Sequence, residues 1–186
     1  MTEQPGYALD RRALMRGAIL LVGGTVAGLP ETAFARMPAP AGTFFAAGER
    51  AILDAVCATL IPRTDTPGAV EAGVPAFIES MMTNWASDAT QARFRAALAD
   101  IDRVAVEDVQ KPFAALAAAQ QLQVLQDYDA DALEVRNRNY LQLKELALMG
   151  YYLSEAGATQ ELRFELAPGV WEPAMPLTAD TRAWAV

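Results

Sequence analysis

Residues 141–153 read Leu-Gln-Leu-Lys-Glu-Leu-Ala-Leu-Met-Gly-Tyr-Tyr-Leu, the most interior-like stretch of the domain. Only Gln142, Lys144 and Glu145 in it are strongly polar. A helix that is apolar on nearly every side packs among other helices rather than on the surface. We therefore predict that the segment from Leu133 to Ala156 forms the central helix of a bundle.

Apolar residues also recur at helical spacing in the segments before this one. Pro62 and Pro112 interrupt the pattern, because proline lacks the amide hydrogen that a helix interior uses. The sequence predicts a helix over Ala46–Ile61, a second that follows Val74-Pro75 as far as Trp85, a third over about Thr90–Val106 and a fourth over about Leu116–Tyr128. The acidic run from Asp129 to Asp131 is typical of a turn or of the start of the next helix.

The pattern changes after Gly157. Apolar and charged residues alternate over 162–166, and several prolines follow from Pro168 onward, which is typical of extended chain. We predict a mainly α protein: a small, irregular helical bundle over residues 44–186, with an extended, proline-rich C-terminal segment from about residue 157. Residues 36–43 form an exposed leader in this interpretation.

The N-terminal region has the order of an export signal. Residues 10–16 read Asp-Arg-Arg-Ala-Leu-Met-Arg, followed by thirteen uncharged residues and then by Ala33-Phe34-Ala35, an Ala-x-Ala cleavage site. This order is typical of the twin-arginine route, which carries folded proteins. We predict a twin-arginine signal over residues 1–35 and a periplasmic mature protein. The signal residues are Arg11, Arg12 and Arg16, and the cleavage-site residues are Ala33 and Ala35.

A membrane anchor is the alternative interpretation of the apolar run. A spanning helix needs about 20 apolar residues, whereas this run has thirteen, contains four glycines and ends before Pro30. The run therefore looks too short to span a bilayer. Cleavage and a weak, uncleaved tether to the inner membrane are both compatible with the sequence.

Composition excludes several kinds of chemistry. The chain has 186 residues, no histidine and one cysteine. Ser-His-Asp and Cys-His catalysis are thereby excluded, as are an internal disulfide, a Cys-x-x-Cys pair, covalent haem attachment and an iron–sulfur ligand set. No Gly-x-Gly-x-x-Gly motif follows a predicted strand. The net charge of −8 argues against nucleic acid and anionic lipid as partners.

Cys57 allows two interpretations. It lies on an apolar stripe with Leu53 and Ile61 at four-residue spacing, which predicts burial as a small apolar group. A lone cysteine in an oxidising compartment can also pair with another chain, so an intermolecular disulfide is the alternative.

Two stretches resemble the gluconate 2-dehydrogenase subunit 3 family. The first is Leu-Ile-Pro-Arg-Thr-Asp-Thr-Pro-Gly-Ala at 60–69, continued by Ala-Gly-Val-Pro-Ala-Phe-Ile at 72–78. The second is Gly-Tyr-Tyr-Leu-Ser-Glu at 150–155, followed by Gly-Ala-Thr at 157–159 and by Pro168-Gly169. The resemblance extends from Phe44 to about Trp171.

The resemblance implies a small, non-catalytic subunit of a periplasmic, membrane-associated sugar or sugar-acid dehydrogenase. Its implied partners are a large flavoprotein of the glucose–methanol–choline type, which carries FAD, and indirectly a cytochrome c subunit with haem c. The small subunit is expected to assist the folding, stability and export of the large one through the twin-arginine translocase. No cofactor or metal is expected on this chain itself.

The motif residues are candidates for contact with the large subunit. In the first stretch, turn chemistry is the competing interpretation: Asp65 can cap its own loop through an Asx-type hydrogen bond, Pro67 stiffens the loop and Gly68 permits a positive φ. In the second, core packing is the default for tyrosine, but adjacent helical residues point about 100° apart, so one of the pair faces outward. The candidate interface residues are Arg63, Asp65, Pro67, Gly68, Tyr151, Tyr152, Glu155, Trp171 and Trp184.

Two other functions are compatible with the sequence. In the first, the chain contributes residues such as Arg63 or Asp65 to a composite dehydrogenase active site, so their mutation changes activity without changing assembly. In the second, the chain is a free periplasmic binding or structural protein, for which isolation of its gene from any flavoprotein gene would be the sign.

Overall fold

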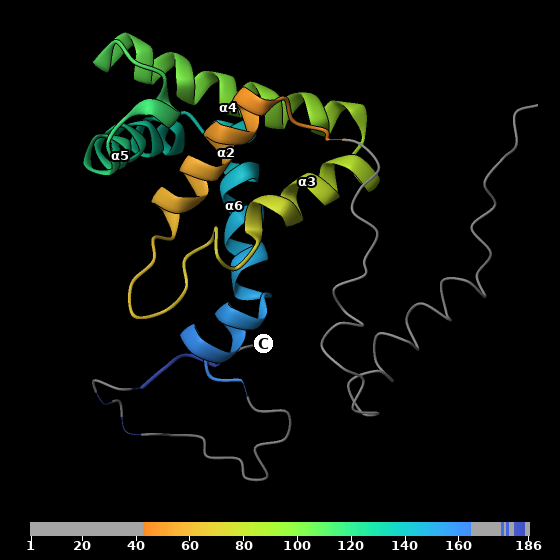
Figure 1. The fold of residues 1–186 in the computed structure, drawn as a ribbon, viewed down its shortest axis with the longest axis vertical. Coiled ribbons are helices and arrows are strands. Elements are labelled where there is room, and N and C mark those ends of the chain that lie inside the picture. Colours follow the sequence, from red (N-terminus) through yellow and green to blue (C-terminus); the bar gives the residue numbers. More distant parts are fainter. Residues whose placement is uncertain (1–42, 165–175, 177, 179–180, 185–186) are drawn as a thin grey trace, which may run out of the picture. The chain divides into compact units, whose positions relative to one another are not determined.

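The computed structural model describes residues 43–164, 176, 178 and 181–184 (Figure 1). The predicted export signal, with Arg11, Arg12, Arg16, Ala33 and Ala35, lies outside these residues, and so does Trp171. The predictions made on them are therefore not addressed by the structure.

The described part of the chain is helical and forms no strand, which confirms the mainly α prediction. A single isolated bridge pairs Arg163 with Trp184. The elements in chain order are α2 (Ala47–Leu60), α3 (Val74–Asn84), α4 (Asp88–Val109), the 3-10 turn η2 (Phe113–Ala115), α5 (Ala118–Glu134), α6 (Arg138–Tyr152) and the short π-type helix η3 (Gly157–Glu161).

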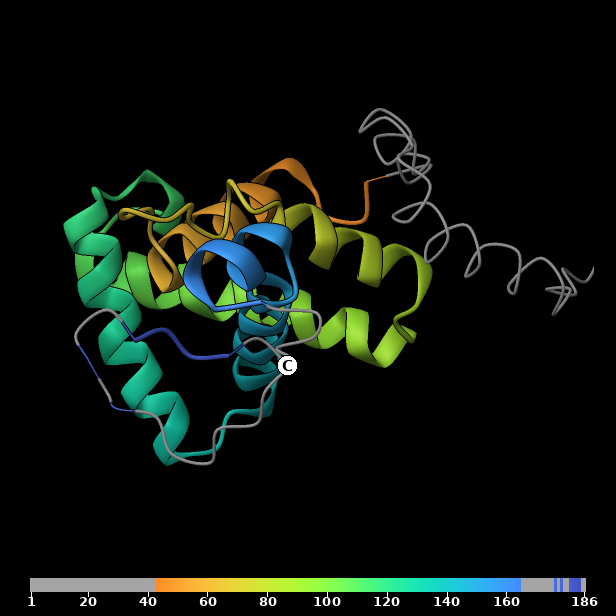
Figure 2. The ribbon, with the colours of Figure 1, turned by 90° about the horizontal axis from the view of Figure 1, so that it is seen from below.

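Helix α6 lies in the middle of the bundle, as predicted, and packs against α3, α4 and α5 (Figures 1 and 2). Its buried side chains are Tyr140, Leu143, Ala147 and Tyr151, which repeat at three- and four-residue spacing on one face. Helix α2 packs against α3, α4 and α5 and contributes Leu53, Val56 and Cys57 to the same core.

The boundary between α5 and α6 corrects two predictions. The predicted helix from Leu133 to Ala156 is divided, because the chain turns at Arg136, whose φ is 51°, and Asn137 caps α6. The Asn137 Oδ1 accepts hydrogen bonds from the amides of Asn139 at 3.2 Å and Tyr140 at 3.4 Å. The predicted turn at 129–131 is also wrong: these residues lie inside α5, where Asp129 pairs with Lys144 of α6 at 2.6 Å.

The predicted extended segment begins later than expected. Residues Gly157–Glu161 form η3 rather than extended chain, because the turn after α6 continues the helical path. The Ser154 hydroxyl donates to the Tyr151 carbonyl at 2.6 Å and accepts from the Gly157 amide at 3.1 Å. A Cβ at residue 157 would lie 2.1 Å from the Tyr151 carbonyl oxygen, so only glycine fits this turn.

Cys57 is fully buried, which confirms its predicted apolar role. Burial, followed by the nearby Asp54 carboxylate, raises the pKa of the thiol to about 12. A disulfide with another chain would therefore require the helix to open. Glu79 of α3 is a buried carboxylate that was not anticipated from the sequence, and it accepts a hydrogen bond from Arg50 of α2.

Candidate functional site

The two motif stretches meet in space, although more than 80 residues separate them in the chain. The Tyr151 hydroxyl donates to the Pro67 carbonyl at 2.9 Å, and the Thr66 hydroxyl donates to a Glu161 carboxylate oxygen at 2.9 Å. Figure 2 shows the segment between α2 and α3 beside the turn that follows α6. The loop of residues 61–73, hereafter the motif loop, and the end of α6 thus form one surface.

The motif loop closes through backbone contacts. The Ala69 amide donates to the Ile61 carbonyl at 2.9 Å, and the Gly68 amide donates to a Glu71 carboxylate oxygen at 3.0 Å. A Cβ on Gly68 would lie 2.7 Å from the Arg63 amide nitrogen and 2.8 Å from the Ile61 carbonyl oxygen. The predicted positive φ of Gly68 is wrong, because the glycine with positive φ in the described residues is Gly73, at 78°. Gly68 is required instead for close approach of the backbone.

The charged residues of the motif loop face solvent. The Arg63 side chain is 74% exposed and lies 3.4 Å from Glu71. Asp65 is exposed and makes no hydrogen bond to the described residues, so the predicted Asx contact is wrong. Thr64 makes the side-chain-to-backbone contact of the loop instead, because its hydroxyl accepts a hydrogen bond from the Thr66 amide at 3.4 Å. Arg63 and Asp65 remain accessible to a partner.

The two tyrosines divide as predicted. Tyr151 is buried, whereas Tyr152 is 42% exposed, with ring centroids 5.3 Å apart in an edge-on arrangement. Glu155 is exposed in the turn that follows. Trp184 is also 42% exposed, and the Arg163 guanidinium lies 4.3 Å from its ring centroid. One face of Trp184 is therefore occupied by its own chain.

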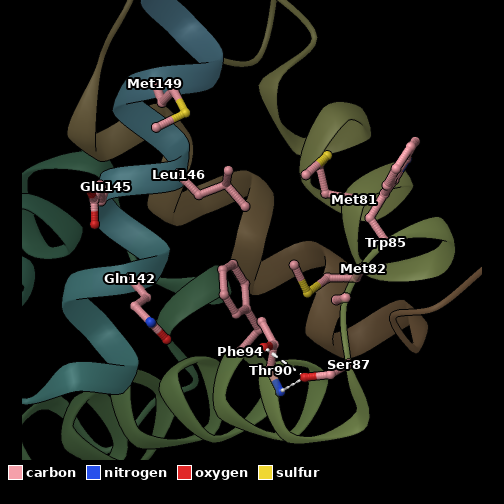
Figure 3. A pocket seen from close by; sticks show the side chains of 11 residues that line it. Met81, Met82, Trp85, Ser87, Thr90, Phe94, Gln142, Glu145, Leu146 and Met149 are labelled. Atoms are coloured by element: carbon pink, nitrogen blue, oxygen red, sulfur yellow. Dashed lines mark hydrogen bonds between the residues drawn. The ribbon is translucent and has the colours of Figure 1, made fainter.

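A second surface was not anticipated from the sequence. An apolar groove of about 590 Å³ lies between α3, α4 and α6 (Figure 3). We call it the methionine groove, because all methionines of the described residues line it. Its apolar lining includes Met81, Met82, Trp85, Phe94, Leu146 and Met149. The available signal was the spacing of Met81, Met82 and Trp85, which places them on one side of α3.

The methionine groove also carries two polar groups from α6. The Gln142 amide oxygen is buried and has no hydrogen-bond partner among the described residues. Glu145 is exposed and forms no ion pair with them. Glu145 and Met149 also line a second hollow, which continues along α6 to Tyr152 and to Leu133 of α5. The side chains of α6 between Gln142 and Tyr152 that border the groove or this hollow are hereafter called the track.

The part of the chain that the structure describes has no cluster of three or more Cys, Asp or Glu side chains placed to hold a metal ion. No helix in that part is both long and apolar enough to cross a membrane.

The fold and these surfaces define a small helical domain with an anchored surface loop and an open apolar groove. The model of the family described as gluconate 2-dehydrogenase subunit 3 matches residues 47–169, and the chain belongs to that family. This match confirms the resemblance in the two motif stretches and indicates an accessory subunit of a dehydrogenase complex. No curated protein and no solved structure matches the chain.

Proposed function

We propose that this chain is the small, non-catalytic subunit of a periplasmic, membrane-associated dehydrogenase that oxidises a sugar or sugar acid. The large subunit is a flavoprotein of the glucose–methanol–choline type that carries FAD, and a cytochrome c subunit with haem c receives the electrons. The small subunit binds and stabilises the flavoprotein and supplies its export signal. The family match over residues 47–169 carries this proposal.

The motif loop supports a role in binding. Tyr151 and Glu161 hold it from one side, and the amide of Ala69 closes it from within. An ordered loop that exposes Arg63 and Asp65 loses little conformational entropy when a partner binds. The loop is therefore suited to recognise a complementary charged surface.

The twin-arginine sequence supports an escort role. A flavoprotein that acquires FAD in the cytoplasm is folded before it crosses the membrane, so it cannot be threaded as an open chain. A bound subunit with a twin-arginine signal can carry such a folded partner across. In this proposal the signal at residues 1–35 serves both chains.

The test replaces Arg11 and Arg12 by Lys in cells that produce both subunits. We expect both proteins to stay in the cytoplasm as a yellow complex, while Arg138→Lys, at an exposed position outside the predicted signal, leaves export intact. Immunoblots of periplasmic fractions measure location, and absorbance of the purified complex measures bound flavin. A flavoprotein that still reaches the periplasm in the double Lys variant would disprove the escort role.

A companion test separates binding from composite catalysis. We expect Arg63→Ala and Asp65→Ala to weaken recovery of the flavoprotein on the tagged small subunit, with turnover per assembled complex unchanged. Unchanged assembly with altered turnover would instead indicate that these residues contribute to the active site.

A further inference from the structure

We propose that the methionine groove is the docking site for one amphipathic helix of the large flavoprotein subunit, and that this helix places an arginine beside Glu145. This inference rests on the proposed function, because the flavoprotein is the partner named there. It adds the surface used on this chain and the chemistry of the segment that occupies it.

The lining of the groove suits a helix with large apolar side chains. Met81, Met82 and Met149 come from two helices that face each other across it (Figure 3). Methionine is unbranched and polarisable, so a methionine surface adapts to side chains of different shape. Such surfaces typically bind the apolar face of an amphipathic helix.

Exposure of the rim favours a protein over a small ligand. Trp85 is 77% exposed and Met149 is 48% exposed. A small-molecule pocket encloses most of its ligand, whereas these two side chains stand open to solvent. Exposed tryptophan at the edge of an apolar groove is typical of residues that contribute strongly to protein interfaces.

The charge of the groove defines the polar side of the occupant. Glu145 and Gln142 are three residues apart on α6 and are therefore neighbours on its surface. Lys144, the cation next to them, is already paired with Asp129 at 2.6 Å. Glu145 lacks a cation and the Gln142 amide oxygen lacks a donor within the described residues. The Gln142 amide oxygen is closed to solvent, whereas Glu145 is exposed, so an arginine of the occupant can donate its planar N–H groups to the Glu145 carboxylate.

The track has the length of a short helix. From Gln142 to Tyr152 it follows α6 for ten residues, or about 15 Å at the usual helical rise. This corresponds to about three turns of a helix lying along it. An occupant of that length can place two or three apolar residues in the groove and one at Tyr152.

Charge also argues against a second copy of this chain as the occupant. A second copy of this chain also has a net charge of −8, so it would bring an excess of acidic side chains to a groove that already carries Glu145. Like charges that are brought together at an interface oppose association. A partner segment with a basic residue has the opposite property.

The experiment uses the full chain, tagged and produced together with the flavoprotein subunit. Glu145→Lys and Trp85→Ala are the test variants. Asp108→Lys is the matched charge reversal and Val106→Ala the matched truncation, both at exposed positions of α4 outside the track. The readouts are flavoprotein recovered per small subunit, by flavin absorbance, and the thermal midpoint of each small subunit alone.

We expect each test variant to lower recovery at least tenfold and each control to stay within twofold of wild type. Thermal midpoints should all agree within about 3 °C, because the four positions are exposed. If wild type and test variants recover the flavoprotein equally, the groove is not the docking site and the proposed function still stands. If wild type itself recovers none, the proposed function fails, and this inference fails with it.

A photo-crosslinker identifies the occupant directly. Benzoylphenylalanine in place of Trp85, irradiated in the assembled complex, should form an adduct with the flavoprotein. Mass spectrometry should place the adduct in a helical segment with an arginine or lysine beside an apolar stripe. An adduct with a second copy of this chain, or with a flavoprotein segment that has no basic residue, would overturn the inference.

Discussion

Replacement of Gly68 by alanine tests the packing of the motif loop. The new Cβ would lie 2.7 Å from the Arg63 amide nitrogen and 2.8 Å from the Ile61 carbonyl oxygen, whereas ordinary contacts of this kind begin at 3.4 Å. Both neighbours are backbone atoms, so neither can rotate away. The backbone at residue 68 must therefore move away from that of Ile61 and Arg63 by roughly 0.6 Å. This movement strains the neighbouring hydrogen bond, in which the Ala69 amide donates to the same Ile61 carbonyl at 2.9 Å.

The expected cost follows from these two effects. Overpacking of this kind costs about 1–3 kcal/mol, and the strained hydrogen bond contributes about 1 kcal/mol more. The described bundle, residues 43–164, has about 120 residues, for which 1 kcal/mol lowers the melting temperature by about 4 °C. We therefore expect Gly68→Ala to lower it by about 8–16 °C.

Two other glycines serve as controls in the same thermal melts followed by circular dichroism. Gly48 lies in α2 with no atom within 4 Å of its added Cβ, so Gly48→Ala should raise the melting temperature by about 2–4 °C. Gly73 has equally open space but a φ of 78°, so Gly73→Ala should lower it by about 4–8 °C. A Gly68→Ala melting temperature within about 2 °C of wild type would refute the close-packing argument.

Three further predictions concern the bundle. Cys57 should not react with a disulfide reagent at pH 8 until the chain is unfolded in guanidinium, because burial raises its pKa to about 12; rapid reaction of the native protein would contradict this. Partial burial raises the pKa of Asp100, but hydrogen bonds from Arg103 and Tyr128 outweigh this effect, so the pKa lies below its usual value. Asp100 therefore stabilises the fold above its unfolded pKa of about 3.9, and that stabilisation is lost as the pH falls through the lower folded value. Asp100→Asn should lower the urea midpoint at pH 7 and make that midpoint decrease less steeply as the pH falls below about 4. A variant whose urea midpoint decreases with acid as steeply as that of the wild type would argue against this role. Asn137→Ala removes the cap of α6 and should cost about 1 kcal/mol of unfolding free energy, which equal urea midpoints would disprove.

The helices could be predicted closely where apolar spacing and proline agree. The prediction of Ala46–Ile61 differs from α2 by one residue at each end, and α3 begins at Val74, just before its predicted start after Pro75. The α5–α6 boundary was missed because the turn uses Arg136, which is not glycine, in a left-handed conformation. The apolar residues around that turn keep the pattern of a continuous helix, so spacing alone does not reveal the break.

The candidate site could be predicted only in part. Local chemistry indicated which residues form a loop and that one tyrosine of the pair faces outward. The contact between Tyr151 and Pro67 joins residues 84 positions apart, and such pairing depends on how the helices pack. The role of Gly68 was likewise misassigned, because a glycine that allows close backbone approach cannot be distinguished in the sequence from a glycine that allows a positive φ in a turn.

Helix α6 carries more apolar surface than its own bundle requires. Its buried side chains, from Tyr140 to Tyr151, lie on one face, which is the face that the core of this chain uses. Yet the opposite side bears Met149 and Tyr152, which are 48% and 42% exposed, and a groove filled by neither α3 nor α4. Exposed apolar tracks of this kind mark contact sites more often than chance surface. The strong interior character of residues 141–153 therefore has two sources: the core of this chain and, in our proposal, the interface with its partner.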